Sequence, residues 1–213
     1  MKTSLKQRSN LSIRVLAPVA LIVAAFSATP QAWAAEGSTA ATGKPRPVVA
    51  TTTVQIQHRT VDLAIDFDTF SRNLIGLLGH YNPADPVIGG SDLKRGLERL
   101  KASQGEQGLM LFDSPLDHGV LFPLIGQPAR KSFRFHIGNP LIAIQMERKN
   151  MGIALYAPLT ILAYERAPGS IRVEYDMPSS SFGQFQDADI NKVAAVLDTK
   201  LHLLLLKAAE VPE

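Results

Sequence analysis

The sequence contains no cysteine, and this absence removes several kinds of structure and chemistry at once. Disulfide bridges, zinc–thiolate sites, iron–sulfur clusters and cysteine nucleophiles are all excluded. A lipid-anchored lipoprotein is excluded as well, because there is no cysteine to acylate. Proteins outside the cytoplasm are often stabilised by disulfides, so an exported form of this chain would have to depend on packing alone.

The common catalytic and nucleotide-binding signatures are also missing. There is no G-x-x-x-x-G-K-[ST] phosphate loop, no G-x-G-x-x-G, no G-x-S-x-G elbow and no H-E-x-x-H. These absences argue against the most frequent nucleotide-binding, hydrolase and metalloprotease classes. They leave unfamiliar chemistry open.

A basic excess is lacking once the first 34 residues are set aside. The whole chain has 22 basic and 19 acidic residues and a pI of about 9.2. The first 34 residues hold four of the basic residues and none of the acidic ones. The remainder is close to neutral, so we expect no nucleic-acid partner, which would require a basic face.

The N-terminus has the three parts of a secretory signal peptide. Basic residues precede an apolar run from Val15 to Phe26, and the small-residue sequence Ala32-Trp33-Ala34 follows. The run is shorter than the about 20 residues of a membrane span. We predict cleavage after Ala34, which removes residues 1–34 and gives a periplasmic or secreted protein without a stable membrane anchor. An uncleaved N-terminal anchor is the alternative.

Two segments are expected after the cleavage site. Residues 35–52 are rich in Ala, Thr, Gly, Ser and Pro and show no apolar period, which predicts a flexible linker. Residues 53–210 are long enough to bury a core and are expected to form a single domain. Alternation between Val54 and Ile65 predicts one or two strands at its start.

The rest of the domain predicts helices and short strands in a mixed order. The expected helices are Phe67–Leu78 capped by Asp66, a second helix capped by Ser91, a short helix from Asn139-Pro140, and a long C-terminal helix from Asp187 or Asp189 to Ala208. The expected strands are Leu109–Phe112, Ser132–Gly138, and Leu159–Tyr164 with Ile171–Tyr175 as a hairpin. Residues 79–91 and 178–183 are expected to be loops, and residues 116–125 are ambiguous. This order favours an α+β fold.

The C-terminal helix is unusually apolar. Leu203–Leu206 place apolar side chains on more than one face. A helix of this kind either lies deep in its domain or meets a second subunit.

Two groups of residues have side chains suited to chemistry. Asp117-His118-Gly119 contains a histidine, which can act as acid, base or ligand near neutral pH. The structural alternative is a turn in which Asp117 caps a helix. Arg134 and His136 alternate on the polar side of a predicted strand, where they would either bind an anion or face solvent.

No metal ion or other cofactor is predicted. The five histidines show no pair with the short spacing of a preformed ligand set. Met146, Met151 and His136 are candidate ligands for copper(I). The competing interpretation is that the methionines fill the core.

Three short motifs carry a family resemblance. They are the run Phe135–Pro140, which ends in Gly-Asn-Pro, the run Leu155–Leu159 with the strand that follows it, and the pair Asp117-His118. In this order and spacing they resemble the family of domain of unknown function 302, over roughly Val54 to Lys207. The long loop 79–91 departs from the shorter members of that family.

The resemblance implies a fold, an assembly and a site. It implies a curved antiparallel sheet packed against a long C-terminal helix, in a layout related to the TATA-binding protein, and it implies a homodimer. Asn139 would cap the following helix, whose N-terminus is a candidate site for a small anionic ligand lined by Tyr156 and His118.

The sequence thus favours a non-enzymatic, dimeric, exported binding or interaction module. Two alternatives stay open. One is a hydrolase or isomerase that uses His118 as acid–base, with Asp117 or Tyr156 nearby. The other is a protein that handles copper or another metal.

Overall fold

The computed structural model describes residues 47–212. The predicted signal peptide, its cleavage site and most of the predicted linker lie outside these residues. The chain from Ala50 onward forms one compact unit. None of the helices in the described part has the length and apolar character needed to cross a membrane.

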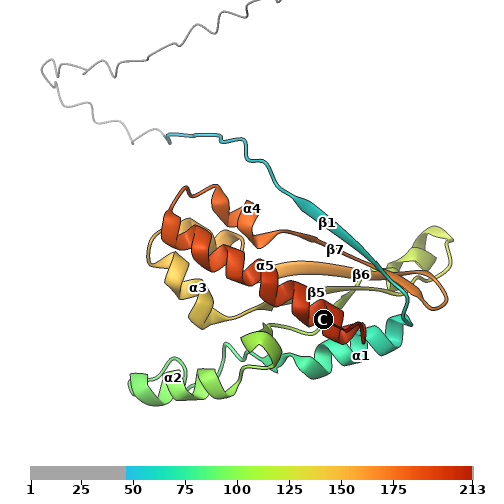
Figure 1. Ribbon diagram of the computed structural model, residues 1–213, viewed down its shortest axis with the longest axis horizontal. Helices are drawn as coiled ribbons and strands as arrows, with labels where there is room; N and C mark the ends of the chain where they lie inside the picture. Colours follow the sequence, from blue (N-terminus) through green and yellow to red (C-terminus); the bar gives the residue numbers. More distant parts are fainter. Residues whose placement is uncertain (1–46, 213) are drawn as a thin grey trace, which may run out of the picture. The chain divides into compact units, whose positions relative to one another are not determined.

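Strands and helices follow each other in a mixed order along the chain (Figure 1). The strands are β1 (His58–Leu63), β2 (Gly79–His80), β3 (Met110–Leu111), β4 (Leu116–Asp117), β5 (Ser132–Gly138), β6 (Leu159–Ala167) and β7 (Ser170–Asp176). The α-helices are α1 (Phe67–Leu77), α2 (Leu93–Ala102), α3 (Pro140–Glu147), α4 (Pro178–Gly183) and α5 (Ala188–Ala208). Three short 3-10 helices are η1 (Glu106–Gly108), η2 (Gly119–Ile125) and η3 (Met151–Leu155).

One sheet holds all seven strands in the order β1-β7-β6-β5-β3-β2, and β4 pairs with β5 beside this path. The long strands pair antiparallel, and only the short β2–β3 pair is parallel. The hairpin β6–β7 turns at Gly169, whose φ of 76° is a conformation that glycine adopts without strain. The first strand therefore lies beside the last one, although they are far apart in the sequence.

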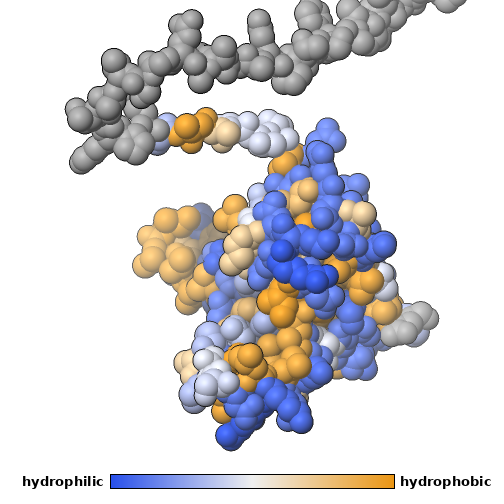
Figure 2. Space-filling model, turned by 90° about the vertical axis from the view of Figure 1, so that its left-hand side faces the viewer, coloured by the Kyte–Doolittle hydropathy of each residue, from blue (hydrophilic) through white to orange (hydrophobic). Residues whose placement is uncertain are grey.

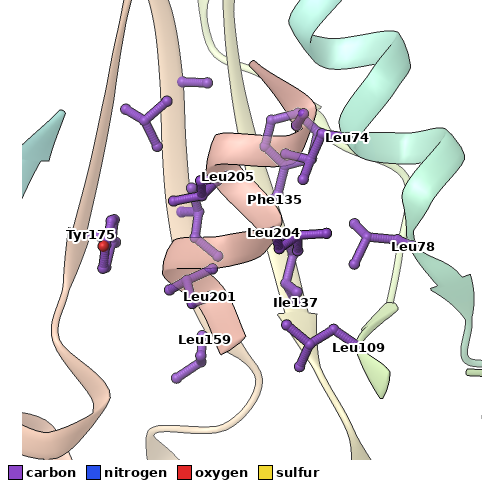
Figure 3. Packing of buried hydrophobic residues seen from close by; sticks show 14 of the residues in the cluster. Leu74, Leu78, Leu109, Phe135, Ile137, Leu159, Tyr175, Leu201, Leu204 and Leu205 are labelled. Carbon is purple, nitrogen blue, oxygen red and sulfur yellow. The ribbon is translucent and has the colours of Figure 1, made fainter. Parts of the chain in front are cut away.

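The helix α5 covers one face of the sheet and closes the core (Figures 1 and 3). Alternate residues of β5 point toward this face: Phe135 and Ile137 are fully buried, and Phe133 is partly buried against the same cluster. Leu201, Leu204 and Leu205 of α5 belong to the same buried cluster, together with residues of α1. The α+β prediction, with a mainly antiparallel sheet on a long C-terminal helix, is confirmed.

The apolar C-terminal helix is explained mainly by this core. Leu204 and Leu205 are buried, whereas Leu203 and Leu206 are only half-buried. Depth in the domain, the first of the two interpretations of Leu203–Leu206, accounts for the buried pair. The homodimer, predicted from this run and from the family resemblance, stays a prediction.

Helix caps follow the local rules of the sequence. Asp66 accepts the backbone N–H groups of Asp68 and Thr69, and Asp187 caps α5 in the same way. The cap of α2 was predicted one residue too early: Asp92, not Ser91, accepts the Arg95 N–H.

The prediction of a loop over residues 178–183 is wrong, because these residues form α4. Pro178 occupies the first helical position, where its missing N–H costs nothing. Phe182 is buried, and α4 packs against α5. The serine-rich sequence hid a short helix that tertiary packing stabilises. The ambiguous residues 116–125 form β4 followed by the 3-10 helix η2.

Candidate functional site

The residues singled out in the sequence lie at opposite ends of β5. His118 donates its backbone N–H to Ser132 O, at the beginning of this strand. Asn139 follows Gly138, at its other end. Because a strand rises about 3.3 Å per residue, the two ends are on the order of 20 Å apart. His118 is therefore not in a position to line a pocket with Asn139.

Asp117 performs the structural role that its sequence context allowed. Its Oδ1 accepts the N–H groups of Gly119 at 2.8 Å and Val120 at 3.2 Å, so it caps η2. The His118 side chain is exposed, and within residues 47–212 it forms no hydrogen bond with another side chain. The geometry gives His118 no orienting carboxylate, which a catalytic acid–base group usually has.

Arg134 and His136 share the face of the sheet opposite α5. His136 Nδ1 lies 2.8 Å from Asp113 Oδ2, and the His136 side chain is 26% exposed. In the described part of the chain, Arg134 Nε is buried without a hydrogen-bond partner. The Asp113 carboxylate already occupies Nδ1 of His136, so these two residues do not form an anion clasp free of acidic groups.

Tyr156 directly follows η3 and contacts α4 and the residues after it. Its hydroxyl donates to Gln184 Oε1 at 3.3 Å, and its ring packs edge-on against Phe185.

The three candidate copper ligands do not meet. Met146 is buried, Met151 is 73% exposed, and His136 is on the polar face of the sheet. Among residues 47–212, no group of three His, Asp or Glu side chains is arranged to hold a metal ion.

A pocket of about 310 Å³ opens beside the Gly138-Asn139-Pro140 turn. Its walls come from α3, from the start of β6 and from the core side of α4 and α5. The residues that line it are Tyr81, Phe112, Gly138, Asn139, Pro140, Ile142, Ala143, Ile144, Met146, Glu147, Ala157, Pro158, Leu159, Phe182 and Leu197. Among these described residues Glu147 is the only charged one, so the pocket is mainly apolar.

Two aromatic rings and one amide shape this pocket. The rings of Tyr81 and Phe112 lie 4.7 Å apart, and Phe112 packs on Gly138, where a larger residue would be tight against it. Asn139 is only 5% exposed. Both ends of its amide have a partner: Nδ2 donates to Gly108 O at 2.6 Å, and Oδ1 accepts the Leu141 N–H at 2.7 Å.

The N-terminus of α3 has no free donor for an anion. Pro140 has no N–H, and the Leu141 N–H is bonded to the Asn139 side chain. The N–H groups of Ile142 and Ala143 both donate to Asn139 O, at 3.0 and 2.9 Å. Anion binding at a helix start requires N–H groups that point at the ligand, so the predicted anionic ligand has no support at this position.

Sequence reasoning did not find this pocket as a unit. Tyr81 was assigned to a loop that is often functional, and Phe112 to a buried strand. The sequence of α3 contains the signal for this pocket, because this short helix has apolar residues on all sides. They are Leu141, Ile142, Ala143, Ile144 and Met146. A short helix of that kind must contact apolar groups in more than one direction.

The family assignment follows from residues 91–207. They match the family described as Domain of unknown function DUF302, and this span is more than half of the chain. The chain belongs to the DUF302 family. The DUF302 match begins at Ser91 rather than near Val54, so β1, α1 and β2 lie outside it. Every residue that lines the pocket except Tyr81 falls within it.

One solved structure has a similar fold although its sequence differs strongly from that of this chain. The crystal structure of an uncharacterized conserved protein DUF302 from Bacillus stearothermophilus is similar with a TM-score of 0.51 at 14% identity. The likeness covers 71% of this chain and 97% of the other, a larger share than the DUF302 sequence match. At that identity the comparison establishes the fold alone. No curated protein matches this chain.

An ionic network lies on the face of the sheet opposite α5, across β1 and β7. Arg172 donates to both Asp62 oxygens at 2.7 and 2.8 Å, which lowers the pKa of that carboxyl to about 2. His58 bonds to Asp176 at 2.8 Å and to Glu174 at 3.3 Å. These carboxylates, Asp176 above all, raise the pKa of His58 above its usual value.

The His58 pair predicts a pH dependence. A raised pKa in the folded state means that the pair stabilises the domain below pH 6.5, and that this contribution is lost as pH rises through the folded pKa. Asp176→Asn is expected to lower the pKa of His58, measured by NMR titration of the ring protons, and to flatten the pH dependence of unfolding. Asp68→Asn, which removes an exposed carboxylate paired with Lys131, should leave the His58 titration in place; an equal change in both variants would contradict the assignment.

Proposed function

We propose that the protein is an exported binding module that holds a small, mainly apolar and uncharged ligand in the pocket beside Asn139. The single observation that carries the proposal is the pocket, which is walled by Phe112, Ile142, Phe182 and Leu197 and open to solvent. Ligand sites are usually concave, mainly apolar and about 300–1,000 Å³ in volume. Export is inferred from the N-terminal sequence pattern, and a homodimer from the family resemblance.

Binding fits the pocket better than catalysis does. A general acid–base reaction needs a titratable group within hydrogen-bonding reach of the substrate. The titratable groups of the lining are the Glu147 carboxylate and the Tyr81 phenol, whose ring packs against Phe112. The amide of Asn139 is already bonded to Gly108 and Leu141. The proposed hydrolase or isomerase would have to act at the exposed His118 instead, at the other end of β5.

The charge of the residues that line the pocket also indicates which ligands it binds. Glu147 would repel an anion, and the α3 N–H groups are occupied. We therefore expect the neutral fluorescent probe phenylnaphthylamine to bind more tightly than the anionic probe anilinonaphthalene sulfonate. The reverse order would contradict the assignment of an uncharged ligand.

Filling the pocket tests the proposal directly. Ala143 lines the pocket from α3, and Ala143→Trp is expected to weaken phenylnaphthylamine binding by about 10-fold or more, because the indole takes the volume that the ligand needs. Gln145→Trp adds the same ring to the exposed side of the same helix and should leave binding unchanged. Fluorescence titration gives both affinities, and circular dichroism checks the fold.

Two outcomes would overturn the proposal. Equal binding by the wild type and Ala143→Trp would show that the probe lies elsewhere. If Ala143→Trp does not fold, Ala143→Leu provides a smaller filling, for which a partial loss of affinity is expected.

Native mass spectrometry of protein from the periplasmic fraction reports export, subunit number and any retained ligand. Recovery of the unprocessed protein in the cytoplasm would contradict export.

A further inference from the structure

A cluster of exposed apolar side chains lies far from the pocket, at the beginning of β5. It belongs to the segment from Leu116 to Lys131, here named the η2 lobe. Val120 and Leu121 are each 57% exposed, Ile125 is 74% exposed and Leu124 is 82% exposed. In Figure 1 the lobe, drawn in yellow-green, extends from the right-hand end of the sheet, and in Figure 2 it projects to the left as a hydrophobic knob.

Several backbone N–H groups of the η2 lobe are bonded within the lobe. Asp117 caps its start, and the N–H groups of Gly126 and Gln127 donate to carbonyls within the lobe, to Pro123 O at 3.1 Å and Phe122 O at 3.2 Å. At its neck Arg130 N–H donates to Gly119 O at 3.3 Å. A side chain at Gly119 would overlap the Arg130 carbonyl, so the neck is closed by glycine. A segment that enters an apolar medium needs this internal satisfaction.

Basic side chains surround the base of the lobe. No charged residue occurs between Asp117 and Arg130 in the sequence. The Arg130 guanidinium lies 4.5 Å from the centre of the Phe122 ring. Exposed Lys131 and Arg166 flank the hollow beneath it together with Glu165, but Lys131 is paired with Asp68 and Arg166 with Asp62. Asp117, the acidic residue at the start of the lobe, is held by backbone N–H groups. The lobe thus combines an uncharged apolar tip with one exposed cation at its base, Arg130, which has no ion pair with a carboxylate in the described part of the chain.

We propose that the η2 lobe inserts into the headgroup layer of an anionic phospholipid membrane and attaches the domain to its surface. Interfacial membrane binding combines buried apolar side chains with basic residues that meet anionic headgroups. A convex lobe with an internally bonded backbone fits a fluid lipid surface. A second copy of the chain would instead be expected to offer a shaped apolar surface to this knob, and the face of the sheet beneath it carries the ionic network of Asp62, Arg172 and Glu174. The proposal is independent of the pocket ligand.

Vesicle co-sedimentation of the processed protein tests this surface. We expect binding to vesicles of phosphatidylglycerol and phosphatidylcholine, and about 10-fold or more weaker binding to phosphatidylcholine alone. The double variant Leu124→Glu with Ile125→Glu should lose the binding to anionic vesicles by about 10-fold or more, because it puts two charges on the tip. Arg130→Gln should reduce both the anionic preference and the salt sensitivity.

A matched control is available at the opposite end of the sheet. Met151 and Leu155 in η3 are 73% and 81% exposed, so Met151→Glu with Leu155→Glu also puts two acidic side chains in place of an exposed apolar pair and should leave vesicle binding unchanged. The proposal is overturned if the wild type does not bind anionic vesicles, or if both double variants bind alike. It is also overturned if Leu124→Glu with Ile125→Glu instead converts a dimer to a monomer without any vesicle effect, which would make the lobe an interface between copies.

Discussion

Gly105→Ala is expected to destabilise the domain by about 3 kcal/mol, because the end of α1 and the chain after α2 cross there in direct backbone contact. A Cβ at position 105 would overlap Gly79 N and Leu77 O, and a Cβ at position 79 would overlap Ser103 O. The N–H groups of Gly79 and Gly105 both donate to Leu109 O, at 3.1 and 3.0 Å. These atoms belong to backbone, so the contact cannot be relieved by turning a side chain.

A second glycine in the same region serves as the control for Gly105→Ala. Gly76 lies in α1, and no atom comes within 4 Å of its would-be Cβ. Gly76→Ala is therefore expected to stabilise the domain by about 0.5–1 kcal/mol, the helix-propensity difference between the two residues. Denaturant unfolding monitored by circular dichroism gives both values. If Gly105→Ala is as stable as the wild type, the backbone crossing is looser than the structure shows.

The local features of this fold were predictable from the sequence, because they depend on neighbouring residues. Asp66, Asn139 and Asp187 cap helices where a short polar side chain precedes an apolar period. The hairpin β6–β7 follows from its Pro-Gly turn, and the bounds of β5 from its alternation. Each of these features is decided within a few residues of chain.

The arrangement of the candidate site depends on contacts that local patterns do not contain. The partner of His136 is Asp113, which became visible only with the pairing of β3 and β5. The pocket collects residues from Tyr81 to Leu197, which five helices and strands and the loops between them bring together. The helix α4 was missed because its serines favour loops locally, whereas its stability comes from the buried Phe182.

The apolar residues of the η2 lobe and of the pocket have surroundings that the sequence does not predict. The apolar run from Val120 to Ile125 left residues 116–125 ambiguous in the sequence, and only the structure shows that Val120, Leu121, Leu124 and Ile125 are exposed. Leu197 and Ile142 belong to or pack against the core cluster, and only the structure shows that they also line a cavity. Apolar residues in a sequence predict burial against something, but they do not say whether the partner is the same chain, a ligand or a lipid surface.

Asn139→Ala is expected to destabilise the domain by about 2–4 kcal/mol, through two separate losses. The helix α3 loses the cap that accepts the Leu141 N–H, and Gly108 O loses the amide donor at 2.6 Å in a nearly buried site. Gly108 has a φ of 72°, so the loop that this bond holds is already confined to a conformation that favours glycine. Thermal and denaturant unfolding measure the change.

The matched control for this prediction is Asn150→Ala. Asn150 also caps a short helix, η3, by accepting the Gly152 N–H at 2.9 Å, but it is exposed and makes no second bond to a distant carbonyl within residues 47–212. Its loss is expected to be about 1 kcal/mol or less. Equal losses at the two positions would show that the bond to Gly108 adds nothing. A much larger loss of stability at Asn139 would mean that Asn139→Ala distorts the wall of the pocket. Reduced ligand binding by this variant would then report the distortion, so Ala143→Trp is the direct test of binding.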